Sequence, residues 1–476
     1  MTHAMVNDHP FQTLFESLGR LPIAHADAVN RQAYEVLYDI LAVPLEKPGR
    51  CILLRAPRAG HGKTHLLARI QHHLGASHEF IPLQAFGTQI DATTVVDDAL
   101  RRLLRPLPAS AGLCVLDMVT RRLLALALQP LVVSGEVPCQ DRDGALAALR
   151  TRPIEIFDFH HPNAVTAHWT RENFEVLGQR FSVELAQRCD LPIREVAFWV
   201  DALFRFVATP VDNSIRLRVL TDEVHAGKPG EGVWMERLQA LLSLLALLMR
   251  VVLVADNLEG FASDERAALK LSAFLGDLRH ATERLDVILS LNQDIWQSAF
   301  IPRLSGGLAD RLSEVVIELK PLTENEMLAL LESRVPGLGA RLLTRVDRAA
   351  AVTHARGLIR AAGVAWLKAS AMDEPESRAV ESRMLDVHAL QPPPPLTAEI
   401  AVDQPSASPA PSPARNAPVS PPTALAAPAP DVPDIASTPA AGEPPAAAAP
   451  PSAAEAADGV DALIRQFLER YGPGSK

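Results

Sequence analysis

Residues Cys51–Leu67 constrain the fold most strongly, because an apolar strand leads through a glycine-bearing turn into a helix that opens with Gly62-Lys63-Thr64. Such glycines let backbone N–H groups turn inward around a polyphosphate, and the helix N-terminus adds partial positive charge. The pattern is that of a phosphate-binding loop, except that Pro57 stands at its first glycine position. We call residues 57–64 the glycine loop. Its predicted ligand residues are Gly60, His61, Gly62, Lys63, Thr64 and His65, with Lys63 on the β- and γ-phosphates and Thr64 on Mg²⁺.

The composition sets broad limits on the chain. At 476 residues it can hold two or three domains with a substantial core. Its formal net charge of −10 gives no general attraction to nucleic acid or to an anionic membrane, so we expect no membrane partner and do not favour nucleic acid. The four cysteines lack any CxxC spacing, and the N-terminus lacks a basic stretch followed by an apolar run. These features favour a cytoplasmic protein.

One apolar run, Leu238–Ala255, contains a single charged residue, Arg250, and approaches the length of a membrane-spanning helix. We favour a different interpretation. An apolar helix would end near Met249, and a β-branched strand, Val251–Ala255, would follow it and lead into Asp256.

Apolar strands alternate with helical patterns along the globular part of the chain. The predicted strands are Cys51–Arg55, Glu79–Leu83, Val251–Ala255, Asp286–Leu291 and Val315–Leu319. The alternation predicts an α/β fold, a P-loop NTPase type of parallel sheet flanked by helices. Helical stretches without a clear strand predict a helical insertion at about 106–232, within a core of 49–320. An N-terminal helical segment, 1–48, would precede the core and contain an amphipathic helix near Ala26–Leu41.

The C-terminal part is expected to hold three segments. A small helical lid is predicted at 321–388, starting with the capping pattern Thr323 to Glu326. Residues 389–457 are rich in Ala and Pro and are predicted to be a disordered linker. Residues 458–472 carry an apolar face at helical spacing, which predicts an amphipathic helix. This helix, or the insertion, would bind a protein partner, although folding back onto its own domain and self-association stay open.

Polar residues follow two predicted strands where a second half of a phosphate site would lie. Asp256 follows Val251–Ala255 and would bind the Mg²⁺, because the carboxyl ends of parallel strands share one edge of the sheet. The next residue, Asn257, cannot accept a proton, so Glu259 is the nearest candidate general base. Asn292 follows the strand Asp286–Leu291 and could orient the attacking water.

The chain resembles the AAA+ superfamily of P-loop ATPases, most closely its origin-recognition-type and STAND-like branches. The resemblance covers Cys51–Leu104 and Val251–Ala371, and it rests on residues 60–64 (Walker A), 251–256 (Walker B), Asn292 (sensor 1), 307–312, 316–323 and 354–360. It implies that Arg311 completes the site of a neighbouring subunit, with Arg303 as a competing candidate. It also implies that Arg356 contacts the γ-phosphate from the lid.

By this resemblance, ATP and Mg²⁺ are the expected ligands. The expected function is slow ATP hydrolysis that drives a nucleotide-dependent switch or the remodelling of a protein partner, in a homo-oligomer if Arg311 acts in trans. Asn257 keeps open an alternative, a scaffold that holds nucleotide and hydrolyses little. A DNA-associated loader or transposition-type ATPase is a third hypothesis, disfavoured by the net acidity. The choice between ATP and GTP is open.

Overall fold

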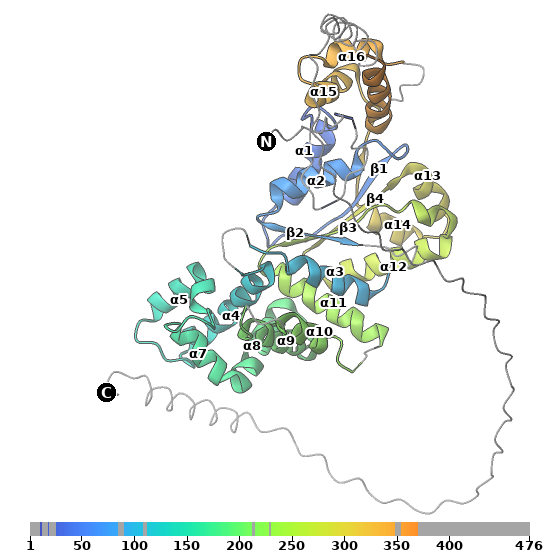
Figure 1. The fold of residues 1–476 in the computed structure, drawn as a ribbon. Helices are drawn as coiled ribbons and strands as arrows, with labels where there is room; N and C mark the ends of the chain where they lie inside the picture. The colour runs from blue at the N-terminus through green and yellow to red at the C-terminus, as the bar shows by residue number, and fades with distance from the viewer. Residues whose placement is uncertain are drawn as a thin grey trace, which may run out of the picture. The chain divides into compact units, whose positions relative to one another are not determined.

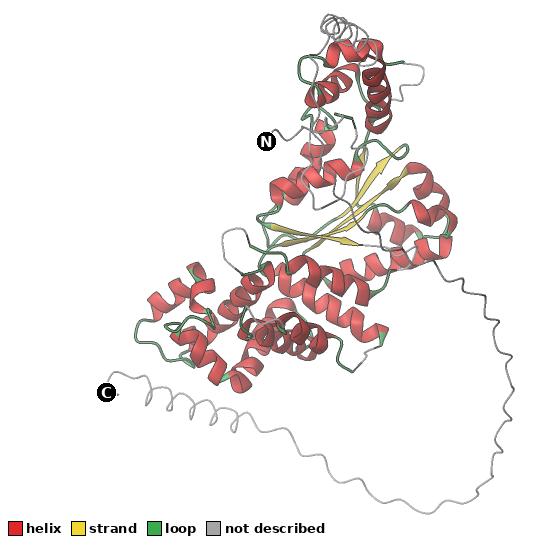
Figure 2. Ribbon diagram, in the orientation of Figure 1, coloured by secondary structure: helices red, strands yellow, loops and turns green. Residues whose placement is uncertain are grey.

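A five-stranded, all-parallel sheet forms the core of the fold (Figures 1 and 2). The computed structural model describes residues 10–11, 18, 25–83, 90–107, 112–211, 215–227, 230–347 and 354–369. The strand order is β2-β3-β4-β1-β5, with β1 (Cys51–Ala56), β2 (His78–Leu83), β3 (Arg250–Ala255), β4 (Leu285–Asn292) and β5 (Val315–Glu318). Every predicted strand is present and agrees to within one residue at each end. An α/β fold with a parallel sheet is therefore confirmed.

Alternating strand residues enter two apolar layers, because successive side chains of a strand point to opposite faces. In β1, Ile52 and Leu54 pack on one face, whereas Cys51 and Leu53 belong to the larger core on the other. The first face is covered by α1 (Arg31–Leu41) and α2 (Lys63–Leu74). The second is covered by α3 (Ala92–Leu103), α11 (Glu231–Ala246) and α12 (Glu265–Ala281). Both faces of the central strands are thus buried, which explains why β1 and β3 are largely apolar.

Helices occupy the long interval between α3 and α11, beneath the second face of the sheet (Figure 1). They are α4 (Val115–Ser134), α5 (Arg142–Thr151), α6 (Pro153–Ile156), α7 (Val165–Glu172), α8 (Phe174–Cys189), α9 (Ile193–Ala208) and α10 (Arg216–Val224). The apolar run 238–255 is divided between the end of α11 and β3, as predicted. Within the described part of the chain, no helix is long and apolar enough to cross a membrane.

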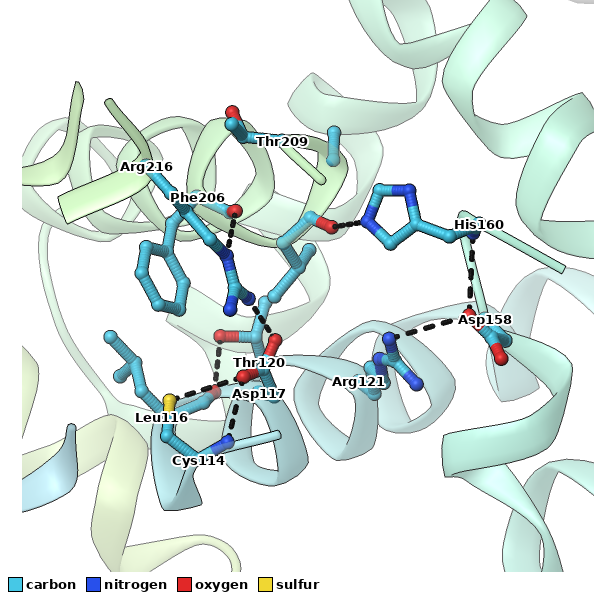
Figure 3. Close-up of polar contacts among 12 residues, drawn as sticks. Cys114, Leu116, Asp117, Thr120, Arg121, Asp158, His160, Phe206, Thr209 and Arg216 are labelled. Carbon is cyan, nitrogen blue, oxygen red and sulfur yellow. Dashed lines mark hydrogen bonds and ion pairs between the residues drawn. The ribbon is translucent and has the colours of Figure 1, made fainter. Parts of the chain in front are cut away.

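A buried polar cluster joins the helices of this insertion (Figure 3). Asp117, on the first turn of α4, is fully buried and forms an ion pair with Arg216 of α10. The same carboxylate accepts hydrogen bonds from the backbone N–H and the thiol of Cys114, at 2.9 and 3.1 Å. Arg216 also donates to the Phe206 carbonyl of α9 at 3.1 Å and lies over the Phe206 ring. These contacts link α4 to α9 and α10, which come much later in the sequence.

Further short helices follow β3 and β4. They are a 3₁₀ helix (Glu259–Ser263), α13 (Gln293–Ile295), a single π-helical turn (Trp296–Phe300) and α14 (Gly306–Leu312).

A small group of helices, which we call the lid, follows β5. It comprises α15 (Glu324–Arg334), α16 (Gly339–Arg345) and a helix at residues 355–369. The predicted capping box is present, since Thr323 and Glu326 each bond to the other's backbone N–H. Ala26 and Val29 from the N-terminal segment are buried in the same apolar cluster as the lid residues. The lid core is therefore built from two distant parts of the chain.

The first helix begins later than the sequence suggested. We predicted a helix near Ala26–Leu41, but residues 27–30 form a turn and α1 begins at Arg31. The reason is Asn30, whose φ of 54° lies in the left-handed region and cannot continue a right-handed helix. The lid beyond residue 369, the linker 389–457 and the helix 458–472 lie outside the described residues.

Candidate functional site

The glycine loop lies at the carboxyl end of β1, next to the point where the order of strand addition reverses. The chain leaves β1 for β2, at one edge of the sheet, and later adds β5 on the other side of β1. Ligands of open parallel sheets bind at such switch points. Gly60 and Gly62 have φ values of 94° and 97°, which glycine adopts without strain, and α2 starts directly at Lys63. The local sequence therefore produces a tight turn that ends in a helix N-terminus.

Lys63 points from the glycine loop to the neighbouring strand. Its Nζ lies 2.7 Å from Oδ1 of Asn292, the last residue of β4. The lysine is only 7% exposed, and this burial lowers the pKa of its ammonium group, while the carboxylates of Asp256 and Glu259 act in the opposite direction. A buried cation held by a neutral amide is a site that favours an anionic ligand.

Asp256 lies between two hydroxyl groups. It follows β3, and its Oδ2 accepts a hydrogen bond of 2.6 Å from Thr64 of the glycine loop. Its other oxygen, Oδ1, accepts a 2.6 Å bond from Ser290 of β4, which is 1% exposed. Ser290 was not singled out from the sequence, because a serine within an apolar strand carries no signal of its partner.

A pocket opens over the glycine loop, and we call it the loop pocket. Most of the remaining predicted site residues line it, namely His65, Glu259 and Arg356 together with Gly60, Gly62, Lys63, Thr64 and Asp256. Asn257 also lines it and has a left-handed φ of 58°. This turn after Asp256 brings Glu259, two residues later, to the pocket wall. Four apolar residues, Ala26, Val29, Leu330 and Ile359, form another part of the lining.

Asn30 connects the three parts of the chain that surround the loop pocket. Its side-chain Nδ2 donates to the His61 carbonyl at 3.0 Å, and its backbone N–H donates to Glu326 of the lid at 3.1 Å. The lid makes a second contact, because the backbone N–H of Arg356 donates to the Gly60 carbonyl at 3.0 Å. Sequence analysis missed Asn30, because nothing local marks its two partners.

Two predicted residues lie elsewhere. The ring of His61 is buried against His354, 5.4 Å between ring centroids, so this residue belongs to the contact between loop and lid. Arg311 is exposed on α14 and lines a different hollow with Cys51, Asp310 and Glu314. Because Cys51 begins β1, that hollow lies at the amino-terminal ends of the strands, whereas the glycine loop lies at their carboxyl ends. The competing Arg303 forms an ion pair with Glu265. Neither arginine lines the loop pocket of its own chain.

The two histidines predict a pH-dependent contact between the glycine loop and the lid. Burial lowers the pKa of both His61 and His354 below the ordinary value of about 6.5, and the nearby cation Arg58 lowers both further. The separated state therefore binds protons more readily, so the contact is fully stable above about pH 6.5 and weakens as the pH falls below it. We expect hydrogen-exchange protection of residues 355–369 to fall severalfold between about pH 7.5 and 5.5.

A His354→Asn variant provides the control for this expectation. The Nδ1 atom of His354 accepts the Gly357 N–H at 3.0 Å, and an asparagine oxygen can replace it as a helix cap without titrating. The variant should show a smaller pH effect. A double variant that also carries His61→Gln should lose still more of the pH effect. If both variants lose as much hydrogen-exchange protection on acidification as the wild type, the two histidines do not have this role.

The fold and the loop pocket define an α/β protein with a cation and hydroxyl groups collected at the carboxyl edge of a parallel sheet. No protein-family model matches this chain, and no curated protein matches it. No group of three or more His, Cys, Asp or Glu side chains that could hold a metal ion occurs among the residues that the structure describes.

Proposed function

We propose that the protein is an AAA+-like P-loop nucleotide-binding protein that binds ATP in the loop pocket. One observation carries the proposal. Lys63 and Thr64 of the glycine loop meet Asn292 and Asp256, which come from two other strands and are 229 and 192 residues away in the sequence. An ordinary strand–turn–helix would not require a cation, a hydroxyl group and a carboxylate to converge at the end of a glycine turn.

The donor set fits Mg²⁺ bound together with a polyphosphate. Mg²⁺ usually takes one or two carboxylates and completes its shell with water and phosphate oxygens. Thr64 and Asp256 lie 2.6 Å apart, so both oxygens can serve the same ion, and Ser290 fixes the orientation of the carboxylate. The ion would neutralise phosphate charge, while Lys63 would bind the terminal phosphates.

The apolar lining fits the base of a nucleotide. Ala26 and Val29 come from the N-terminal segment, whereas Leu330 and Ile359 come from the lid. Nucleotide pockets combine an apolar wall with a few polar groups that fix orientation. A bound nucleotide would therefore contact the core, the N-terminal segment and the lid at once, and its binding would stabilise their association.

Hydrolysis is proposed to be slow. Asn257 cannot act as a base, and Glu259 is the carboxylate at the pocket wall that could accept a proton from water, while Asn292 would orient that water once the phosphates engage Lys63. A slow ATPase suits a nucleotide-dependent switch acting on a protein partner. Arg311 would contribute only to the site of a second copy, in a homo-oligomer. The alternative, a scaffold that holds nucleotide without turnover, is favoured by Asn257.

Steady-state ATP turnover over a range of protein concentrations separates these functions. Specific turnover that rises with concentration supports a site completed by Arg311 of another copy, and binding without turnover supports the scaffold. A protein that shows no ATP binding and no ATP turnover would refute the proposal.

If turnover occurs, Asp256→Asn is expected to reduce it by about 100-fold or more, since the variant loses the charge that holds Mg²⁺. Nucleotide affinity in the absence of Mg²⁺ should change little. The matched control is Asp277→Asn, at an exposed position of α12. A variant with wild-type, Mg²⁺-dependent turnover would rule out the metal role of Asp256.

A further inference from the structure

The two central peptide groups of the glycine loop are held by residues from outside the loop. The Gly60 carbonyl accepts from the Arg356 N–H of the lid, and the His61 carbonyl accepts from the Asn30 side chain, both at 3.0 Å. In a trans peptide the C=O and the following N–H point in opposite directions. Among the described residues no peptide is cis. Holding these two carbonyls therefore also sets the direction of the His61 and Gly62 N–H groups.

We infer that Asn30 is a positioning residue for phosphate binding: by holding the His61 carbonyl, it keeps the Gly62 N–H directed at the phosphates. This inference rests on the proposed function. Glycine loops bind phosphate through their backbone N–H groups, and a loop of such flexible residues loses affinity if its peptides can rotate. Gly60 and Gly62, on either side of His61, have the backbone freedom that would allow such rotation.

The surroundings of Asn30 fit this role. A Cβ atom added to Gly62 would lie 3.2 Å from Nδ2 of Asn30, so the Asn30 amide packs directly against the loop. Arg69 of α2 donates to the Val29 carbonyl at 3.3 Å and pairs with Asp27 at 3.0 Å, which holds the turn before Asn30. The left-handed φ of Asn30 directs its backbone N–H to the lid while its side chain reaches the loop.

The same residue makes phosphate affinity depend on the position of the lid. The Asn30 N–H bonds to Oε1 of Glu326, whose Oε2 closes the capping box of α15 with Thr323. The carboxylate that fixes the start of the lid helix thus also fixes Asn30. If the lid moves away, Arg356 releases the Gly60 carbonyl and Asn30 loses its bond to Glu326, so the loop is held less firmly.

Asn30→Gly tests the inference, because glycine keeps the left-handed backbone and the N–H bond to Glu326 but removes the amide. ATP and inorganic tripolyphosphate are both expected to bind about three- to tenfold more weakly, the value of one hydrogen bond. Without ligand, amide exchange in residues 58–63 should be faster than in the wild type. The control is Asp190→Gly, which replaces another left-handed residue at the end of α8 and should change none of these quantities.

The outcomes are distinct. Equal weakening of both ligands, with wild-type protection of α15, supports a role on the phosphate loop. Unchanged binding, or a loss for ATP but not for tripolyphosphate, overturns it, since the latter would mean a contact with the base. Asn30→Ala, which loses the donor without adding a charge, should repeat the loss and provides the test if the glycine variant does not fold. A wild-type protein that binds neither ligand would instead refute the proposed function.

Discussion

Replacing Lys63 by alanine is expected to lower the affinity for ATP by about 10- to 100-fold or more, measured by calorimetry without Mg²⁺. Hydrogen bonds to charged groups contribute about 1.5–3 kcal/mol, and each 1.4 kcal/mol changes affinity tenfold. Lys63 is buried and its ammonium group bonds a neutral amide at Asn292, so its charge is available to a phosphate. Removing the buried ammonium group relieves its desolvation cost, so the variant should still fold.

The matched control is Lys270→Ala, at an exposed position of α12 outside the loop pocket. It removes the same charge from the chain and should leave ATP affinity unchanged. Wild-type affinity in Lys63→Ala would mean that the glycine loop does not bind phosphate, and it would remove the basis of the proposed function. Equal losses in both variants would point to a general electrostatic effect instead.

Replacing Asp117 by alanine is expected to destabilise the protein by about 3–5 kcal/mol, measured from the shift of its urea transition. Asp117 is fully buried and is the carboxylate that pairs with the buried Arg216. Its loss leaves the guanidinium group without a counter-charge and the Cys114 N–H without its side-chain acceptor. Because the pair joins α4 to α10, we expect the helical insertion to be the first part of the protein to lose its structure in the variant.

Two further variants test the cause. Asp201→Ala removes a half-exposed carboxylate that pairs with Arg205 on the surface of α9, and should cost at most about 1 kcal/mol. The double variant Asp117→Leu, Arg216→Met removes both buried charges and should recover most of the lost stability. If Asp117→Ala loses no more stability than Asp201→Ala, the buried pair does not stabilise the insertion.

The loop pocket could be predicted only in part. Gly60 to His65, Asp256, Glu259 and Arg356 were all identified from the sequence and all lie at the pocket or form its loop, although the ring of His61 turns to the lid. A glycine turn and a polar residue at a strand end leave local signals. Asn30 and Ser290 leave none, because their partners are set by how the chain returns to the loop.

The sequence alone determined the elements of this protein. Mainly apolar runs of five or six residues marked the strands, and the glycine turn marked the start of a helix at Gly62-Lys63-Thr64, where α2 begins at Lys63. Backbone conformation there depends on near neighbours: on glycine freedom, on side-chain periodicity and on capping. Where a local choice served a distant contact, the prediction was wrong. Asn30 delays the start of α1 to Arg31, because its left-handed conformation lets it bond to residues 31 and 296 positions away.

The tertiary structure alone decided which elements meet. The strand order places β4 between β1 and β3, so that Lys63 reaches Asn292 and Thr64 reaches Asp256. Arg311 instead lines a hollow at the amino-terminal end of β1. The pairing of Asp117 with Arg216, 99 residues away, is of the same kind. Such contacts depend on how long crossovers and the buried faces of helices pack together. That packing is a property of the whole chain, and no short segment encodes it.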